Sequence, residues 1–209
     1  MNSVHPINHV IQSSNDNSVP TVAEINSNLI DTRSFESRTV LLFGEITDIV
    51  ARKTTELLVA LDTASSKPIT VLVSSPGGHV ESGDSIHDVV RFIRSPVHMI
   101  GTGWVGSAAA HVFLAAMSEH RFCLPNTRFL IHQPSGGIGG KGTDIAIQAR
   151  EILRIRERIA RTIAKATGHT LEKVMSDIER DHWLSATEAV DYGLVSKVIE
   201  HRSELENTD

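Results

Sequence analysis

Three things are scarce in this sequence, and each scarcity excludes a class of protein. The single cysteine among 209 residues is Cys123, so the chain forms no internal disulfide and no cysteine-rich zinc site. Aromatic residues make up 4% of the chain, which predicts a core of aliphatic side chains. No apolar run approaches the ~18 residues that suggest a membrane-spanning helix. We therefore expect an ordinary globular protein in which Cys123 is a buried apolar residue.

The charge balance and the N-terminal residues narrow the expected partners and location. Lys and Arg number 20 against 25 Asp and Glu, for a net charge of −5, and without an excess of basic residues nucleic-acid binding is not expected. The first 20 residues lack the basic start, apolar block and cleavage site of a secretory signal, so we expect a cytoplasmic protein without membrane association. Zinc and calcium motifs are missing, and neither a metal nor a cofactor is expected.

Three segments are expected along the chain. Residues 1–30 are rich in Asn and Ser and have no sustained periodicity, which predicts a mobile arm. Residues 31–201 carry the apolar patterns of one domain, and residues 202–209 form a polar tail. A chain of this size buries enough surface for a single core.

Within the domain, short apolar strands alternate with helical patterns. Beta-branched and apolar runs predict strands over residues 39–46, 69–74, 97–100, 121–124, 127–132 and 194–199. Apolar residues at helical spacing predict helices over residues 48–64, 108–117, 171–179 and 185–193, and one more that carries Ile86 and Ile93 and ends before Pro96. Because the strands are continuously apolar, we expect repeated βαβ units and a mainly parallel, covered sheet, which is the α/β fold class.

A longer helix is predicted over residues 143–167, ending at Gly168. At ~1.5 Å per residue it would span roughly 36 Å, about the width of a small domain. One stripe of this helix is apolar, whereas five arginines give its other sides a polar character. We expect the helix to project past its own core, where its polar sides face solvent or a partner subunit.

Ser107 is the candidate nucleophile of the chain. It follows a glycine-rich stretch, residues 101–106, in which backbone can approach a ligand, and it precedes a run of strong helix formers. A serine at a helix start lies beside N–H groups that have no partner within the helix, and such groups can hold a developing negative charge. A hydrolytic serine also needs a base, a group that orients the base, and donors aimed at the oxyanion.

Two histidines compete for the role of base. His132 ends an apolar strand and is followed by Gln133 and Pro134, where a side chain can be held rigidly at a sheet edge. His111 lies four residues after Ser107 and thus on the same helical face. Its position inside a turn packed by Ala and Val favours a structural role, and His132 is the better candidate.

The orienting carboxylate and the oxyanion donors are less sharply defined by pattern. Six aspartates are available: Asp84, Asp88, Asp144, Asp177, Asp181 and Asp191. Asp181 lies between two helices and before an aromatic residue, a loop context in which a carboxylate can face a partner. Gly77 and Gly78 directly follow a strand, so their N–H groups can point at a ligand, as can the N–H of Ala108; a simple tight turn is the alternative.

Two other glycine-rich motifs do not match known binding loops. Residues 135–142 differ from a phosphate-binding P-loop because neither Ser nor Thr follows Lys141. The sequence around Ser107 lacks the second glycine of an α/β-hydrolase nucleophile elbow.

Taken together, the motifs resemble the ClpP family, the serine peptidases that form the proteolytic subunit of the Clp protease. The resemblance covers roughly residues 39–199. It rests on five stretches in the family's order: SSPGGHVESGDSIHDVVRFI, the serine segment, RFCLPNTRFLIHQPSGG, TDIAIQAREIL and ERDHWLSATEAVDYGLV. The spacings between Ser107, His132 and Asp181 also agree with the family.

The resemblance implies a role for each site residue. It assigns Ser107 as nucleophile, His132 as general base and Asp181 as orienting carboxylate. The N–H groups of Gly78 and Ala108 would form the oxyanion hole. The residues beside the bound peptide would be Gly77, Gln133, Pro134, Gly136 and Gly137, with the peptide pairing as an added strand.

The resemblance also implies an assembly. The fold would be the spiral of βαβ units that the family shares with the crotonase enzymes, and helix 143–167 would be its handle. Through the handle, two heptameric rings would stack into a homo-oligomeric chamber that cleaves unfolded polypeptides passed on by an AAA+ unfoldase.

Two other functions stay open at this point. Many members carry Met after the nucleophile and then Gly, where this chain has Ala108 and Ala109, and His111 replaces an apolar residue. The family's usual leader is not recognisable before Thr39. These differences motivate a structural or regulatory ring subunit that pairs with an active paralogue. Acyl-CoA chemistry on the shared architecture ranks last, because crotonases do not need this Ser, His and Asp set.

Overall fold

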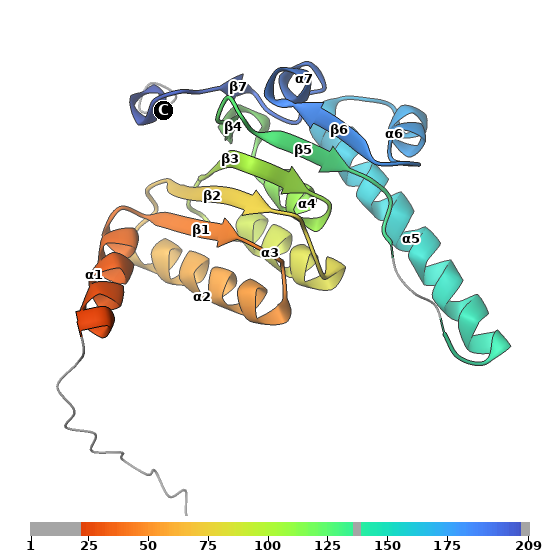
Figure 1. Ribbon diagram of the computed structural model, residues 1–209, viewed down its shortest axis with the longest axis horizontal. Helices are drawn as coiled ribbons and strands as arrows, with labels where there is room; N and C mark the ends of the chain where they lie inside the picture. The colour runs from red at the N-terminus through yellow and green to blue at the C-terminus, as the bar shows by residue number, and fades with distance from the viewer. Residues whose placement is uncertain (1–21, 136–138, 206–209) are drawn as a thin grey trace, which may run out of the picture. The chain divides into compact units, whose positions relative to one another are not determined.

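The computed structural model describes residues 22–135 and 139–205 (Figure 1). Of these, residues 22–33 belong to one unit and the residues from 34 onward to another. Helix α1 (Val22–Glu36) begins within residues 1–30, the segment for which we predicted a mobile arm, and the mobility of that segment stays a prediction. The helix itself was not predicted because α1 has no apolar stripe, and periodicity therefore gave no helical signal. Residues 1–21 of the predicted arm lie outside the described part of the chain.

A seven-stranded sheet organises the described residues from 34 onward (Figure 1). Its main path runs β1 (Thr39–Phe43), β2 (Ile69–Ser75), β3 (Val97–Gly106), β4 (Arg121–Cys123) and β7 (Lys197–Val198), with every pair parallel. The first half of β3 pairs with β4, and its second half pairs with β5 (Arg128–Ile131). Strand β6 (His182–Ser185) then adds antiparallel to β5. The α/β class and the mainly parallel sheet are confirmed.

Three helices cover one face of this sheet (Figure 1). They are α2 (Asp48–Ala64), α3 (Val80–Phe92) and α4 (Ala108–Phe113). Thr47 caps α2 by accepting a hydrogen bond from the N–H of Val50 at 3.3 Å, as its position before the apolar stripe predicted. The core between helices and sheet is aliphatic except for a few rings, among them Phe113 packed edge-on against Phe129.

The long helix α5 (Gly142–Thr167) has 26 residues and ends at Gly168, whose φ of 79° is the left-handed conformation that closes helices. Its predicted range is confirmed to within one residue. Only Ala160 and Ile163 are buried, both in its second half, which contacts α4 and α6 (Leu171–Asp177). The first half extends away from the sheet (Figure 1). The helix is therefore anchored at one end, as its length predicted.

The remaining elements are α7 (Ala186–Asp191) and two 3-10 turns, η1 (Ser118–His120) and η2 (Arg202–Glu204). The predicted capping box of α7 is confirmed: the N–H of Ser185 donates to Glu188, and the N–H of Glu188 donates to the Ser185 hydroxyl. Among the described residues, no helix is both long enough and apolar enough to cross a membrane.

Several predicted boundaries differ from the structure. Strand β3 continues to Gly106, where we expected a loop, and α4 ends at Phe113 rather than at residue 117. The last strand covers only Lys197–Val198 of the predicted range 194–199. The extension of β3 depends on glycine, because a Cβ at Gly101 would lie 3.1 Å from side-chain atoms of both Phe129 and Thr127.

Candidate active site

Ser107 occupies the single residue between β3 and α4. Its φ of 54° and ψ of −124° are unusual for a residue with a side chain, and the strain marks a position that its neighbours hold in place. The N–H of Ser107 donates to the carbonyl of Leu130 at 2.8 Å, and its own carbonyl accepts from the N–H of His111 at 3.2 Å. The hydroxyl does not cap α4. The backbone of Ser107 is therefore fixed at the strand–helix junction, and its hydroxyl is not used to cap the helix.

Gly77 lies directly against this junction. A Cβ on Gly77 would be 2.7 Å from the Cβ of Ser107, 2.8 Å from the carbonyl oxygen of Gly106 and 2.9 Å from the nitrogen of Ala108. No other residue fits at such distances, and the φ of 98° also favours glycine. The turn after β2 is thus brought within contact of Ser107 and of the first N–H of α4.

Gly78 is the next residue of the same turn and carries an N–H that the sheet does not use. A short parallel bridge joins it to Ile46: the N–H of Ile46 donates to the carbonyl of Gly77, and the N–H of His79 donates to the carbonyl of Ile46, both at 2.8 Å. The bridge takes the groups on either side of Gly78 and leaves its own N–H outside the pairing. Glycine is required here too, since a Cβ would lie 2.4 Å from the carbonyl oxygen of Ile46.

His132 and Asp181 come together at the ends of β5 and β6. The antiparallel register pairs Ile131 with His182, so the next step along it sets His132 opposite Asp181. Nδ1 of His132 lies 3.4 Å from Oδ1 of Asp181, and the two side chains are 20% and 65% exposed. Because β5 also pairs with the end of β3, Gly106 opposite Leu130, the same strand brings this pair to the edge where Ser107 begins α4.

Nε2 of His132 is buried and has no hydrogen-bond partner among the described residues. The hydroxyl of Ser107 and this nitrogen are therefore not hydrogen-bonded in this conformation. Catalytic hydrogen bonds are often long in a free enzyme and tighten once substrate binds. The structure thus places His132 next to Asp181, and Ser107 next to Gly77 and Ala108. The hydrogen bond between Ser107 and His132 is not formed.

A cleft of about 530 Å³ lies beside the histidine. Its lining residues are His132, Gln133, Pro134, Ser135, Glu179, Arg180 and Asp181. The N–H of Gln133 donates to the carbonyl of Ile178 at 2.8 Å, and its side-chain amide donates to the carbonyl of Glu179 at 2.9 Å. These bonds hold the segment after His132 to the segment before Asp181. The predicted peptide-binding residues Gln133 and Pro134 line this cleft, whereas Gly136 and Gly137 lie outside the described residues.

His111, the competing base, faces a different carboxylate. Its Nε2 lies 3.1 Å from Oδ1 of Asp84, and its side chain is 6% exposed. Burial, and then the neighbouring His87, lower the pKa of His111 to about 4. A buried ring that is already paired and weakly basic is not available to Ser107, and the structural interpretation of His111 is favoured.

Sequence reasoning missed the aromatic brace that holds β6. The rings of Trp104 in β3 and Trp183 in β6 stack with centroids 6.1 Å apart and planes 3° apart, and the guanidinium of Arg128 lies 4.4 Å from the centre of the Trp183 ring. The brace joins the strand that leads to Ser107 with the strand that follows Asp181. Two tryptophans in a chain with few aromatic residues were the one available signal.

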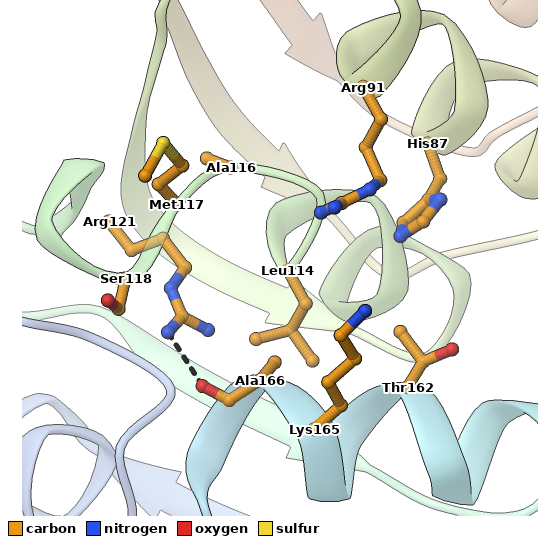
Figure 2. Close-up of a pocket in the computed structure, with 10 residues that line it drawn as sticks. All are labelled: His87, Arg91, Leu114, Ala116, Met117, Ser118, Arg121, Thr162, Lys165 and Ala166. Carbon is orange, nitrogen blue, oxygen red and sulfur yellow. Dashed lines mark hydrogen bonds between the residues drawn. The ribbon is translucent and has the colours of Figure 1, made fainter.

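A second cleft, of about 280 Å³, lies between α3, the end of α4 and the second half of α5 (Figure 2). It is basic: Arg91, Arg121 and Lys165 line it together with His87, and Nη2 of Arg121 donates to the carbonyl of Ala166 at 2.8 Å. None of the predicted site residues lines it. Within the described part of the chain, no group of three or more His, Cys, Asp or Glu side chains is arranged to hold a metal ion.

Known proteins are similar to this chain over most of its length. The family model for the Clp protease matches residues 23–202. The chain is 56% identical to the ATP-dependent Clp protease proteolytic subunit 2 of Gluconobacter oxydans over 178 residues, 84% of this chain and 80% of the relative. It is 55% identical to the ATP-dependent Clp protease proteolytic subunit 3 of Rhizobium etli over 171 residues, 82% of this chain and 88% of the relative.

Solved structures give the same result. The structure is similar to ClpP1 from Listeria monocytogenes, with a TM-score of 0.77 at 46% identity, covering 84% of this chain and 99% of that one. A single-residue variant of the same protein gives a TM-score of 0.80 at 48% identity with the same coverage. With matches of this extent in both sequence and fold, the chain belongs to the Clp protease family of serine peptidases.

Proposed function

We propose that this chain hydrolyses peptide bonds through an acyl-enzyme on Ser107, with His132 as general base and Asp181 as the carboxylate that orients it. The observation that carries the proposal is the meeting of three segments at one sheet edge: the β3–α4 junction, the Gly77 turn and the β5–β6 pair. These supply the nucleophile, the donors and the base, which acyl transfer by serine requires.

In the first step the hydroxyl oxygen of Ser107 attacks the scissile carbonyl carbon while Nε2 of His132 takes the hydroxyl proton. Nε2 suits this role because it carries no other hydrogen bond in the described structure. Asp181, 3.4 Å from Nδ1, would hold the ring in the tautomer that leaves Nε2 free to accept, and would stabilise the imidazolium that forms. His132 then gives the proton to the leaving amine, and a water molecule repeats the sequence on the ester.

The oxyanion of the tetrahedral intermediate is proposed to bind the N–H groups of Gly78 and Ala108. The N–H of Gly78 lies outside the bridge to Ile46, and that of Ala108 begins α4, where the first N–H groups lack partners within the helix. Gly77 sets the separation of the two donors, since its backbone lies in contact with both Ser107 and Ala108. Donors fixed in this way need no rearrangement as charge develops.

The bound peptide is proposed to run beside Gly77, Gln133, Pro134, Gly136 and Gly137 and to pair with backbone as an added strand. The position of Gln133 and Pro134 in the lining of the cleft next to His132 supports this path. Main-chain pairing recognises extended chain rather than a particular side chain, which fits unfolded polypeptides as substrates.

The chamber of two stacked heptameric rings, and delivery of substrate by an ATP-driven unfoldase, are also part of the proposal. The first half of α5 leaves Ile145, Ile147 and Leu153 at 40%, 47% and 59% exposed, which supports its use as a contact between subunits. Relatives are named ATP-dependent proteases, which supports the ATPase partner. The native mass of the purified protein tests the rings, and the cytoplasmic location stays a prediction for cell fractionation to test.

Covalent labelling tests the proposed nucleophile. The purified assembly is treated with a fluorophosphonate, and the modified residue is identified by mass spectrometry. We expect one adduct, on Ser107, together with loss of hydrolysis of a short peptide amide. An unlabelled Ser107 in an assembly that still hydrolyses the peptide would reject the assignment, and an assembly without any activity would favour a regulatory ring subunit instead.

A further inference from the structure

One carboxylate outside the candidate site joins three helices. Asp84, in α3, accepts two hydrogen bonds from the guanidinium of Arg158 in α5, Nη1 to Oδ1 at 2.6 Å and Nη2 to Oδ2 at 2.7 Å. Its Oδ1 also lies 3.1 Å from Nε2 of His111 in α4. A bidentate pair between Arg and a carboxylate has a fixed geometry. Through Arg158 and His111, the carboxylate of Asp84 therefore joins α3, α4 and α5 at a single point.

His111 carries this tie to the start of α4. Its backbone N–H donates to the carbonyl of Ser107 at 3.2 Å, so it belongs to the first turn after the proposed nucleophile. The ring is neutral near neutral pH, because burial and then His87 lower the pKa of His111 to about 4. A neutral ring has one N–H, and since Nδ1 has no hydrogen-bond partner among the described residues, Nε2 is the nitrogen that donates to Asp84.

The same turn is supported from the side by α3. The ring of His87 stacks on that of His111, with centroids 4.4 Å apart and planes 14° apart, and its Nδ1 lies 3.1 Å from Oδ1 of Asp88. The other surroundings of His87 are the basic cleft of Figure 2, with Arg91 and Lys165. The first turn of α4 is therefore held by a ring contact with His87 as well as by the hydrogen bond from His111 to Asp84.

Helix packing next to Asp84 brings α3 and α4 close together at a glycine. A Cβ at Gly83 would lie 3.2 Å from the Cβ of Ala108, which is tighter than ordinary van der Waals contact. Gly83 and Asp84 are consecutive in α3, and they contact Ala108 and His111, one turn apart in α4. A change at Asp84 is thus expected to act on the direction of α4, and through it on the N–H of Ala108.

We propose that Asp84 is a positioning residue for Ser107: through His111 it sets the direction of the first turn of α4, and through Arg158 it holds that turn against α5. The proposal rests on the proposed nucleophilic role of Ser107. Asp84 acts through His111 and does not itself touch the reacting atoms. Its removal should therefore impair the aim of the nucleophile and leave peptide binding unchanged.

The test compares variants that break the tie with one that breaks an equivalent bond elsewhere on α5. Asp84→Asn and Arg158→Gln remove the ion pair, whereas Arg161→Gln removes only the exposed pair that Arg161 forms with Glu157 along the same helix. We expect fluorophosphonate labelling of Ser107 to slow about tenfold in the first two and to change less than about twofold in the control. For a short peptide amide, kcat should fall by the same factor while KM stays within about twofold.

Each outcome decides the proposal. Unlabelled Ser107 in the unmodified protein would reject the proposed function and this inference together. Normal labelling of the unmodified protein with an unchanged rate in a folded Asp84→Asn variant would reject this inference alone, as would a loss confined to KM. A purely structural role would lower the melting temperature without separating kcat from KM. If Asp84→Asn does not fold, Arg158→Lys decides: it keeps the charge without the two-pronged bond, so slower labelling supports the proposal and an unchanged rate rejects it.

Discussion

Two histidine–aspartate pairs lie near Ser107, and they are built in opposite ways. His132 and Asp181 sit at strand ends, 3.4 Å apart, with Asp181 65% exposed. His111 and Asp84 sit on helices, 3.1 Å apart and largely buried, with Arg158 holding the carboxylate in two places. A base must gain and lose a proton and reach its substrate, which the open pair allows. The enclosed pair has its carboxylate already engaged, so it suits holding a helix in place.

The difference also shows why residue type alone does not identify a catalytic pair. Both histidines are within reach of an aspartate, and both belong to elements that contact Ser107. Each ring also leaves one nitrogen without a partner among the described residues, Nε2 in His132 and Nδ1 in His111. What separates the pairs is the carboxylate: Asp181 is 65% exposed, whereas Asp84 is 18% exposed and is bound by Arg158. Changing one pair at a time tests which of the two serves catalysis.

Removing the nucleophile should have the largest effect on hydrolysis, because neither histidine–aspartate pair would then have a serine to activate or position. Ser107→Ala is expected to lower hydrolysis of a peptide amide by at least about 10³-fold and to abolish fluorophosphonate labelling. The circular dichroism spectrum and the native mass should not change, since the backbone bonds of Ser107 remain. Peptide hydrolysis that persists in a homogeneous variant preparation would contradict the assignment of Ser107.

Changing the two aspartates one at a time should show which pair contributes more to kcat. Asp181→Asn is expected to lower kcat by about 10²- to 10⁴-fold, because an amide at this position favours the wrong ring tautomer of His132. Asp84→Asn, the matched change in the enclosed pair, should cost only about tenfold. Steady-state kinetics on the same peptide gives both numbers. The reverse order of the two losses would mean that the enclosed pair serves the chemistry.

The enclosed pair should make the stability of the fold depend on pH. The pKa of His111 falls from 6.5 to about 4 on folding, so below pH 6.5 the unfolded chain binds a proton that the folded chain does not. The stability that the neutral His111 ring contributes is therefore fully present above pH 6.5. It declines toward pH 4, by up to roughly 1.4 kcal/mol per pH unit. Urea unfolding from pH 7 to pH 4.5 measures the slope.

The control for this pH dependence is a variant without the buried ring. His111→Gln removes the titrating ring and should flatten the slope. Equal slopes in the unmodified protein and in His111→Gln would show that the enclosed ring is not the source of acid sensitivity.

Much of the fold could be predicted from the sequence because its signals are local. Helix caps, apolar stripes and the glycines after β2 each act within a few residues, and α2, α5 and the capping box of α7 were found in this way. Strand β6 was not found: four residues give too short a pattern, and its partner β5 lies far away in the chain. That strand sets Asp181 opposite His132, which is why pattern alone could not choose among six aspartates.

The enclosed pair was missed for the same reason. Asp84, His111 and Arg158 belong to three helices, and nothing in the spacing of one helix indicates what the next one brings to it. Helix α1 failed differently, because its sequence has no apolar stripe to detect. Local rules thus identified most of the elements, and contacts between distant segments decided which polar residues meet.

The smallest expected effect concerns the far end of β6 and tests what holds Asp181 in place. Ser185 ends β6 and caps α7 through its hydroxyl, and Ser185→Ala should cost about 1 kcal/mol of stability. Hydrolysis should change less than about twofold, because the register of β6 is set by its backbone pairing with β5 and by the Trp104–Trp183 stack, neither of which involves the hydroxyl. Urea unfolding and peptide kinetics measure the two effects, with the exposed neighbour change Thr187→Ala as control. A loss of activity much larger than twofold would mean that Asp181 depends on α7, and that the open pair is held less independently than its strand contacts indicate.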